Sequence, residues 1–285
     1  MDALLIPQIL NALYGISTLA LVALGLAVIL GLLGVLNLAY GEMVMVGAYC
    51  AYVVQAQGWP YLTAVPLAVG VCAVLGFAVE RWLVRPLYAR PFDTLVVTWG
   101  LSLLIRKTVE AIFGTGFKSL TEPVSGTMQV LGATYPRYRL LLIAISVAVL
   151  IALIVWYGRS RTGTRIRAMV GNPDLARALG VPVNRYAAVT FVVGTCLAGL
   201  GGVMIAPLLP VQPFMGLDYI LQSFFVLVVG GLGSVAGLLA GALVVGGVNS
   251  VVSAIWDNSA GYVTVLTVAI LFLWLRPRGL YARAQ

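Results

Sequence analysis

Residues 30–48 read LGLLGVLNLAYGEMVMVGA, a passage in which glycines interrupt a long apolar segment. The uncharged run that leads into this passage covers residues 3–41. As one straight helix, that run would measure about 60 Å, roughly twice the hydrocarbon thickness of a membrane. We therefore predict that the helix breaks within this passage, at Gly31, Gly34 and Gly41, with Asn37 among them.

A second passage repeats this arrangement, since residues 227–247 read LVVGGLGSVAGLLAGALVVGG. Irregular backbone at membrane depth persists only where it is buried in protein or lines a cavity. Broken helices at matching positions of two halves are typical of transporters. The alternative interpretation is that these glycines only let neighbouring helices pack closely.

The composition is that of an integral membrane protein, because 61% of the 285 residues are hydrophobic and only 9% are charged. A spanning helix needs about 20 apolar residues. The uncharged runs cover residues 3–41, 43–79, 140–158, 186–217, 219–256 and 258–275. We predict an all-α, polytopic fold of about 8–10 transmembrane helices with two glycine-rich broken-helix repeats, in a single transmembrane domain, 1–285. No basic residue precedes the first apolar stretch, so we expect a first span and not a signal peptide.

Basic residues gather beside the apolar spans, in residues 81–90, 159–185 and 276–283. The positive-inside rule places such clusters in the cytoplasm. Contact with anionic lipid headgroups accounts for the formal net charge of +8. We therefore expect membrane lipid as a partner and do not expect nucleic acid.

With these clusters inside, the chain threads from an external N-terminus to an internal C-terminus. Residues 114–138 are rich in Gly, Pro, Thr and Ser and are predicted to form a periplasmic loop. The segment 219–233 is short for a full crossing, which leaves the number of passes open by one. The predicted spans are 8–30, 43–57, 61–82, 92–113, 139–158, 186–208, 219–233, 236–256 and 260–275.

The loop 159–185 contains a short, capped helix. Asn172 is predicted as its N-cap, Pro173 as its first residue and Gly180 as its end, and Asp174 lies in the positive first turn. A bare linker would need neither caps nor a defined helix, so we interpret the segment as a docking element on the cytoplasmic side. The alternative is an interfacial helix that lies on anionic lipid.

Charged residues within the apolar segments are few. Glu42 follows the first break, where a carboxylate must face a cavity or the interface, or cap the next helix. Arg106 and Glu110 are four residues apart and are predicted to pair on one helix face, while Lys107 extends outward.

The sequence lacks the residues that metal binding, nucleotide hydrolysis and hydrolase activity require. The chain has no histidine, and Cys50, Cys72 and Cys196 lie singly in apolar segments, so we predict no metal site and no cofactor. The chain contains no P-loop and no GxSxG motif, and it offers no Ser/His pair. We therefore predict no catalytic residues and no enzyme activity.

Motifs along nearly the whole chain are similar to those of a known family. They are Gly34 to Tyr49, Glu80-Arg81, Arg85-Pro86-Leu87, Gly163 to Ala168 leading into Asn172, Phe191, Leu197 to Gly202, Val228 to Ser234 and Arg276 to Leu280. In this order they resemble the permease subunits of branched-chain amino acid ABC importers, the LivH type. Residues 98–103 and 219–224 look more like the urea and short-chain amide branch of that family. One departure is Tyr40, where the family usually has histidine.

The resemblance implies a subunit of the bacterial inner membrane with several partners. These are a second, LivM-like permease subunit, two cytoplasmic ATPase subunits and a periplasmic solute-binding protein. The resemblance assigns ATPase coupling to the arginine-rich loop 159–185. The predicted coupling residues are Arg165, Arg167, Asn172, Pro173, Asp174, Leu175, Ala176, Arg177, Leu179 and Gly180.

The two broken passages predict a solute pathway lined mainly by neutral hydrogen-bonding groups. Its residues are Asn37, Tyr40, Glu42, Gln222, Ser223, Gly230, Gly231 and Gly233. Such a lining suits a small neutral or zwitterionic solute, such as an amino acid, an amide or a urea-like compound. The alternative function is an ion-coupled secondary transporter, which usually carries midplane acids and needs no capped docking helix.

Overall fold

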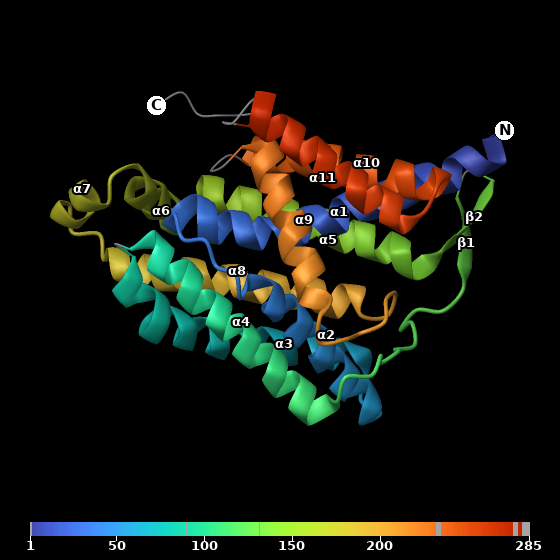
Figure 1. Ribbon diagram of the computed structural model, residues 1–285, viewed down its shortest axis with the longest axis horizontal. Helices are drawn as coiled ribbons and strands as arrows, with labels where there is room; N and C mark the ends of the chain where they lie inside the picture. The colour runs from blue at the N-terminus through green and yellow to red at the C-terminus, as the bar shows by residue number, and fades with distance from the viewer. Residues whose placement is uncertain (1, 89, 131, 232–234, 276–278, 281–285) are drawn as a thin grey trace. The chain divides into compact units, whose positions relative to one another are not determined.

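The computed structural model describes residues 2–88, 90–130, 132–231, 235–275 and 279–280, and most of them lie in helices (Figure 1). The long helices are α1 (Asp2–Leu33), α2 (Tyr40–Ala56), α3 (Ala64–Ala78), α4 (Pro91–Phe113), α5 (Arg137–Arg159), α8 (Val183–Ile205), α9 (Met215–Gly230), α10 (Val235–Ile255) and α11 (Asn258–Leu275). The shorter ones are α6 (Arg161–Gly171), α7 (Pro173–Ala178), the 3-10 helices η1 (Tyr61–Thr63) and η3 (Arg85–Leu87), and the π-helix η2 (Val79–Val84).

The prediction of an all-α polytopic membrane fold is confirmed. Within the described residues, 5 helices are long and apolar enough to cross a membrane: Ile6–Gly31, Tyr61–Leu87, Arg137–Arg159, Val183–Ile205 and Ala236–Ile255. Met215–Gly230 and Ser259–Leu275 are shorter apolar helices. Helices α2 and α4 coincide with the predicted spans 43–57 and 92–113. The number of passes stays a prediction.

The chain divides into two compact units. Unit 1 comprises Met1–Ala23, Thr121–Val149 and Leu221–Gln285, and unit 2 comprises Leu24–Leu120 and Leu150–Ile220. In unit 1, α10 and α11 pack together. In unit 2, α8 packs along α2 and α3, and α4 packs on α2.

The first predicted break is present. Helix α1 ends at Leu33, Gly34 has a positive φ of 66°, and no helix forms before Tyr40. The side-chain oxygen of Asn37 accepts a hydrogen bond of 3.0 Å from the backbone N–H of Ala39, which orders the turn into α2. Gly31 and Gly41 lie inside the flanking helices and do not form the break.

The second break follows α9, which ends at Gly230. Gly231 has a φ of 100°, a conformation that side chains other than glycine's rarely adopt. Gly233 lies outside the described residues. A Cβ added to Gly230 would clash with the carbonyl of Gly237, so close backbone packing accompanies the break. The glycines of this passage therefore both interrupt the helix and allow neighbouring helices to pack closely.

Close backbone contact also builds the core of unit 2. A Cβ added to Gly47 would clash with the carbonyl of Gly199, and one added to Gly202 would clash with that of Val44. Small residues at such positions let helix backbones approach one another. They fix α2 and α8 as one packed pair.

The predicted loop 114–138 contains a β-hairpin, which was not predicted. Strand β1 (Thr127–Val130) pairs antiparallel with β2 (Ala133–Pro136), with Met128 opposite Tyr135. In unit 1 the Tyr135 hydroxyl donates to the side-chain oxygen of Asn11 at 2.9 Å, and Arg139 donates to the same oxygen at 2.8 Å. The hairpin is thereby attached to the beginning of α1.

Candidate functional site

The capped helix predicted in the arginine-rich loop is present as α7. The side-chain oxygen of Asn172 accepts from the backbone N–H groups of Asp174 and Leu175 at 3.1 and 3.0 Å. At the other end Gly180 has a φ of 80°, and the N–H of Val181 donates to the carbonyl of Ala176 at 2.9 Å. This is a Schellman ending, so both ends of the helix are satisfied locally.

A second helix, α6, precedes α7 and was not predicted. Its N-cap is Ser160, whose hydroxyl oxygen accepts from the N–H of Gly163 at 2.9 Å. Its apolar face packs inward, because Ile166 and Met169 form a buried core with Ala176 of α7 and Val183 of α8. The segment from α6 to the start of α8 is thus a folded element, which we call the coupling element (residues 161–186) after the role predicted for it.

Two of the predicted coupling arginines hold this element in place. Arg165 donates to the hydroxyl of Tyr186 on α8 at 2.7 Å. Arg167 donates to the carbonyls of Tyr157 and Gly158 at the end of α5. Because these guanidinium groups are engaged within the chain, they attach α6 to α8 and α5.

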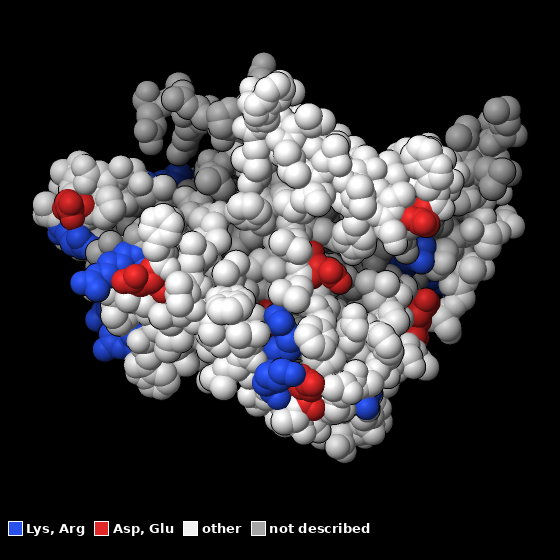
Figure 2. All heavy atoms as spheres, viewed as in Figure 1, with Lys and Arg blue, Asp and Glu red and all other residues white. Residues whose placement is uncertain are grey.

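The outer side of the coupling element exposes apolar residues. Leu175 and Leu179 are 57% and 74% exposed, whereas Ala176 between them is buried. Asp174 and Arg177 form an exposed ion pair of 2.8 Å beside them. Figure 2 shows that charged side chains are few on the face in view and that several gather where α6, α7 and the start of α8 lie.

A buried polar stripe on α4 faces the first break. Its members recur every fourth residue and all are buried: Thr94, Thr98, Ser102 and Arg106. The hydroxyl oxygen of Thr98 accepts from the N–H of Leu38 at 3.2 Å. Ser102 donates to a carboxylate oxygen of Glu42 at 2.8 Å, and Arg106 forms an ion pair with the same oxygen.

The predicted pairing of Arg106 with Glu110 is wrong. Arg106 pairs with Glu42, and Glu110 pairs with Lys107 at 2.6 Å. The prediction that Glu42 could face the cytoplasmic interface is not met, because its side chain is 1% exposed. It contacts Ser102, which lies midway along α4. The physical reason is the non-helical segment 34–39, which returns the chain along α4 before α2 begins.

The predicted pathway residues fall into both units. Asn37, Tyr40 and Glu42 are buried in unit 2, and the Tyr40 hydroxyl lies against Gly25. Gln222 is half-buried and Ser223 is buried, both in the part of α9 that belongs to unit 1.

Some buried polar groups near the first break have unused hydrogen-bonding capacity. Asn37 Nδ2, Glu42 Oε2 and Arg106 Nε have no hydrogen-bond partner among the described residues. Buried polar groups without partners are costly, and polar groups inside membrane segments mark solute pathways. Ser102 and Arg106 were not among the predicted pathway residues, although their spacing of four with Thr94 and Thr98 was visible in the sequence.

Apolar helices of spanning length, helices broken at glycines and a folded polar loop define a multi-pass membrane permease component. The chain belongs to the family described as the branched-chain amino acid transport system permease component, whose model matches residues 8–275. The predicted resemblance to LivH-type permeases is thereby confirmed. The relatives are transport components and not enzymes, as predicted.

Individual relatives cover the chain almost end to end. The high-affinity branched-chain amino acid transport system permease protein LivH of Escherichia coli K12 is 26% identical over 98% of this chain and 96% of its own. The ribose import permease protein RbsC of Haemophilus influenzae is 26% identical over 95% of this chain and 84% of its own. Among solved structures, PsaBC from Streptococcus pneumoniae in complex with Fab covers 95% of this chain and 92% of its own, with a TM-score of 0.53 and 14% identity. The similarity to PsaBC is a similarity of fold alone.

Proposed function

We propose that the chain is the transmembrane permease subunit of a bacterial inner-membrane ABC importer for a small neutral or zwitterionic solute. The solute is a branched-chain amino acid, or urea or a short-chain amide. Two separate ATPase subunits supply the energy, a second, LivM-like permease subunit completes the pathway, and a periplasmic binding protein delivers the solute. Membership of the permease family supports these partners.

The observation that carries the proposal is the coupling element. Its inner side is a packed core, and its outer side presents Leu175 and Leu179 on a helix that is capped at both ends. Exposed apolar side chains on a rigid base are suited to insertion into a groove of a partner protein. We assign that groove to an ATPase subunit.

An interfacial helix on lipid is the weaker interpretation of this segment. Such a helix lies with a continuous apolar face in the headgroup region. In α6 that face, with Ile166 and Met169, is buried against α7 and α8. Helix α7 has 6 residues and exposes the ion pair of Asp174 and Arg177 beside its leucines.

An ion-coupled secondary transporter is also less well supported. Secondary transporters usually carry acids near the membrane midplane that help to bind the driving ion. Among the described residues, Glu42 is the acid beside the first break, and it is paired with Arg106. The paired carboxylate is already neutralised by a cation of the protein itself.

The test is to replace both exposed leucines with aspartate, in the variant Leu175→Asp with Leu179→Asp. Two carboxylates in an apolar contact should prevent docking, so the ATPase subunits should no longer co-purify with the chain. The matched control is Leu62→Asp with Leu209→Asp, which alters two leucines that are exposed outside the coupling element. Equal recovery of the ATPases with both variants, at equal expression, would refute the assignment.

A further inference from the structure

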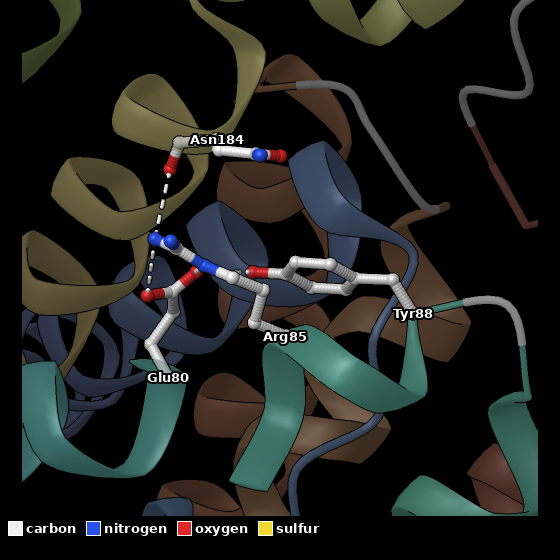
Figure 3. Close-up of polar contacts among 4 residues, drawn as sticks. All are labelled: Glu80, Arg85, Tyr88 and Asn184. Carbon is white, nitrogen blue, oxygen red and sulfur yellow. Dashed lines mark hydrogen bonds and ion pairs between the residues drawn. The ribbon is translucent and has the colours of Figure 1, made fainter. Parts of the chain in front are cut away.

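A buried ionic cluster connects η2 and η3, which follow α3, to the first turn of α8, which is the last part of the coupling element. Figure 3 shows Glu80, Arg85 and Tyr88 with their polar groups turned toward one another, and Asn184 beside them. Arg85 Nε donates to Glu80 Oε1 at 3.1 Å, and Arg85 Nη2 donates to Glu80 Oε2 at 3.0 Å. The Tyr88 hydroxyl donates to Glu80 Oε1 at 3.1 Å. We name these three residues the Glu80 cluster.

The Glu80 cluster is built for fixed geometry. The side chain of Glu80 is 0% exposed and both of its oxygens are used, while that of Arg85 is 23% exposed. A bidentate contact between a guanidinium and a carboxylate fixes orientation as well as distance. Burial, together with the negative charge of Glu80, raises the pKa of Tyr88, so its hydroxyl keeps the proton that it donates. Such complete pairing offsets the cost of burying the Glu80 carboxylate.

Arg85, the first residue of η3, extends the contact to α8. Its Nη2 donates to the backbone carbonyl of Asn184 at 3.4 Å. Asn184 follows Val183, which belongs to the buried core of the coupling element. A chain of contacts therefore runs from α7 through this core to the first turn of α8, and from there through Arg85 to Glu80.

The backbone around Glu80 has an unusual form. Glu80 lies in the π-helix Val79–Val84, and Arg85 begins the 3-10 helix that follows. Single turns of π-helix occur frequently at functional positions, because they change the direction of the side chains that follow. Further into α3, the hydroxyl of Thr195 on α8 donates to the carbonyl of Cys72 at 3.2 Å. Helices α3 and α8 are thus joined both along their packed length and at the coupling element.

We infer that the Glu80 cluster is a positioning device that makes the end of α3 move as one body with the coupling element when the ATPases close and open. This inference rests on the proposed function. In the proposed importer, α7 receives the movement of the ATPase, and the cluster passes it to α3 as well as to α8. The role of Glu80, Arg85 and Tyr88 is transmission, and none of them contacts solute.

The test measures a distance in the purified complex with its ATPase subunits and needs no knowledge of the solute. Spin labels are attached to Trp82→Cys on η2 and Arg161→Cys on α6, two exposed positions. The native Cys50, Cys72 and Cys196 are replaced by alanine in this background. Distance distributions are recorded by pulsed electron paramagnetic resonance without nucleotide and after trapping with ATP and vanadate.

With Glu80 intact, we expect the same distance maximum in both nucleotide states. With Glu80→Gln, which keeps the shape and removes the charge, the maximum should shift or broaden on trapping. Arg85→Lys cannot span both oxygens and should give an intermediate change. Arg81→Ala is the matched control, because Arg81 is exposed on the same π-helix, and it should behave as the unmodified chain.

The outcomes separate this inference from the proposed function. Failure of the ATPases to co-purify with the unmodified chain would refute the proposed function. If they co-purify, then a shift with Glu80 intact, or unchanged distributions with Glu80→Gln, would overturn the positioning role alone. Should Glu80→Gln not assemble, Tyr88→Phe leaves the Glu80–Arg85 ion pair in place and is measured instead. It should broaden the trapped distribution, and an unchanged one would count equally against the inference.

Discussion

Glu42 at the start of α2 forms an ion pair with Arg106 on α4, and both side chains are buried. The pair connects the end of the first helix break to the polar stripe of α4. Ser102 donates to the same carboxylate oxygen, and the Arg106 guanidinium lies 5.4 Å from the centre of the Phe214 ring. The pair therefore holds the first turn of α2 against the middle of α4.

We expect Arg106→Met to destabilise the protein more than the double variant Glu42→Gln with Arg106→Met. Removing one partner of a buried ion pair costs about 3–5 kcal/mol, because an uncompensated charge remains, whereas neutral replacement of both is far less harmful. The measurement is thermal unfolding of the purified complex in detergent. A double variant that unfolds at or below the temperature of the single variant would contradict the role of the pair.

We expect Asn172→Ala to loosen α7 while leaving the rest of the protein unchanged. Loss of a helix N-cap costs about 1 kcal/mol, because two backbone N–H groups lose their acceptor. Amide hydrogen exchange should accelerate in residues 173–180. Ser160→Ala, which removes the N-cap of α6, should accelerate exchange in α6 instead. Unchanged exchange in residues 173–180 of Asn172→Ala would show that the cap does not stabilise α7.

The features that could be predicted from sequence are those that local chemistry determines. Gly34 and Asn37 end one helix and start the next through their own backbone and side-chain preferences. Asn172 and Gly180 specify the two ends of α7 in the same way. These predictions needed no knowledge of the rest of the chain.

The missed features depend on partners distant in the sequence. Arg106 has an acid four residues away, yet it pairs with Glu42, because the segment before α2 returns along α4. Helix α6 was missed because its arginines conceal the apolar spacing of Ile166, Met169 and Val170, whose packing appears only with α7 and α8. The strands of the hairpin have 4 residues each, too few for a clear alternation.

We expect solute-dependent ATPase activity of the reconstituted complex with a small neutral or zwitterionic amino acid, amide or urea-like compound. The predicted pathway offers mainly neutral groups, and its one carboxylate is paired with Arg106, so a solute of net charge would lack a counter-charge. The panel comprises branched-chain amino acids, urea, short amides, ribose and inorganic anions, each with the binding protein present. Stimulation by ribose or an anion alone would contradict this expectation.

We expect Gly231→Val to abolish uptake of the stimulating solute while membrane insertion stays normal. A β-branched residue at a φ of 100° is strained by about 1–2 kcal/mol or more, and the break must absorb that strain. Gly70→Val is the control, because Gly70 is an exposed helical glycine with nothing within 4 Å of an added Cβ. Uptake by Gly231→Val equal to that of the control would show that the positive φ is not required.

ATP-driven import by this chain is tested most directly by solute uptake into proteoliposomes that hold the complete complex, with and without ATP on the ATPase side. The importer proposed for this chain should accumulate solute only with ATP, and ionophores that collapse proton and sodium gradients should not change the rate. Uptake that proceeds without ATP and stops when an ion gradient is collapsed would contradict ATP-driven import and establish secondary transport instead.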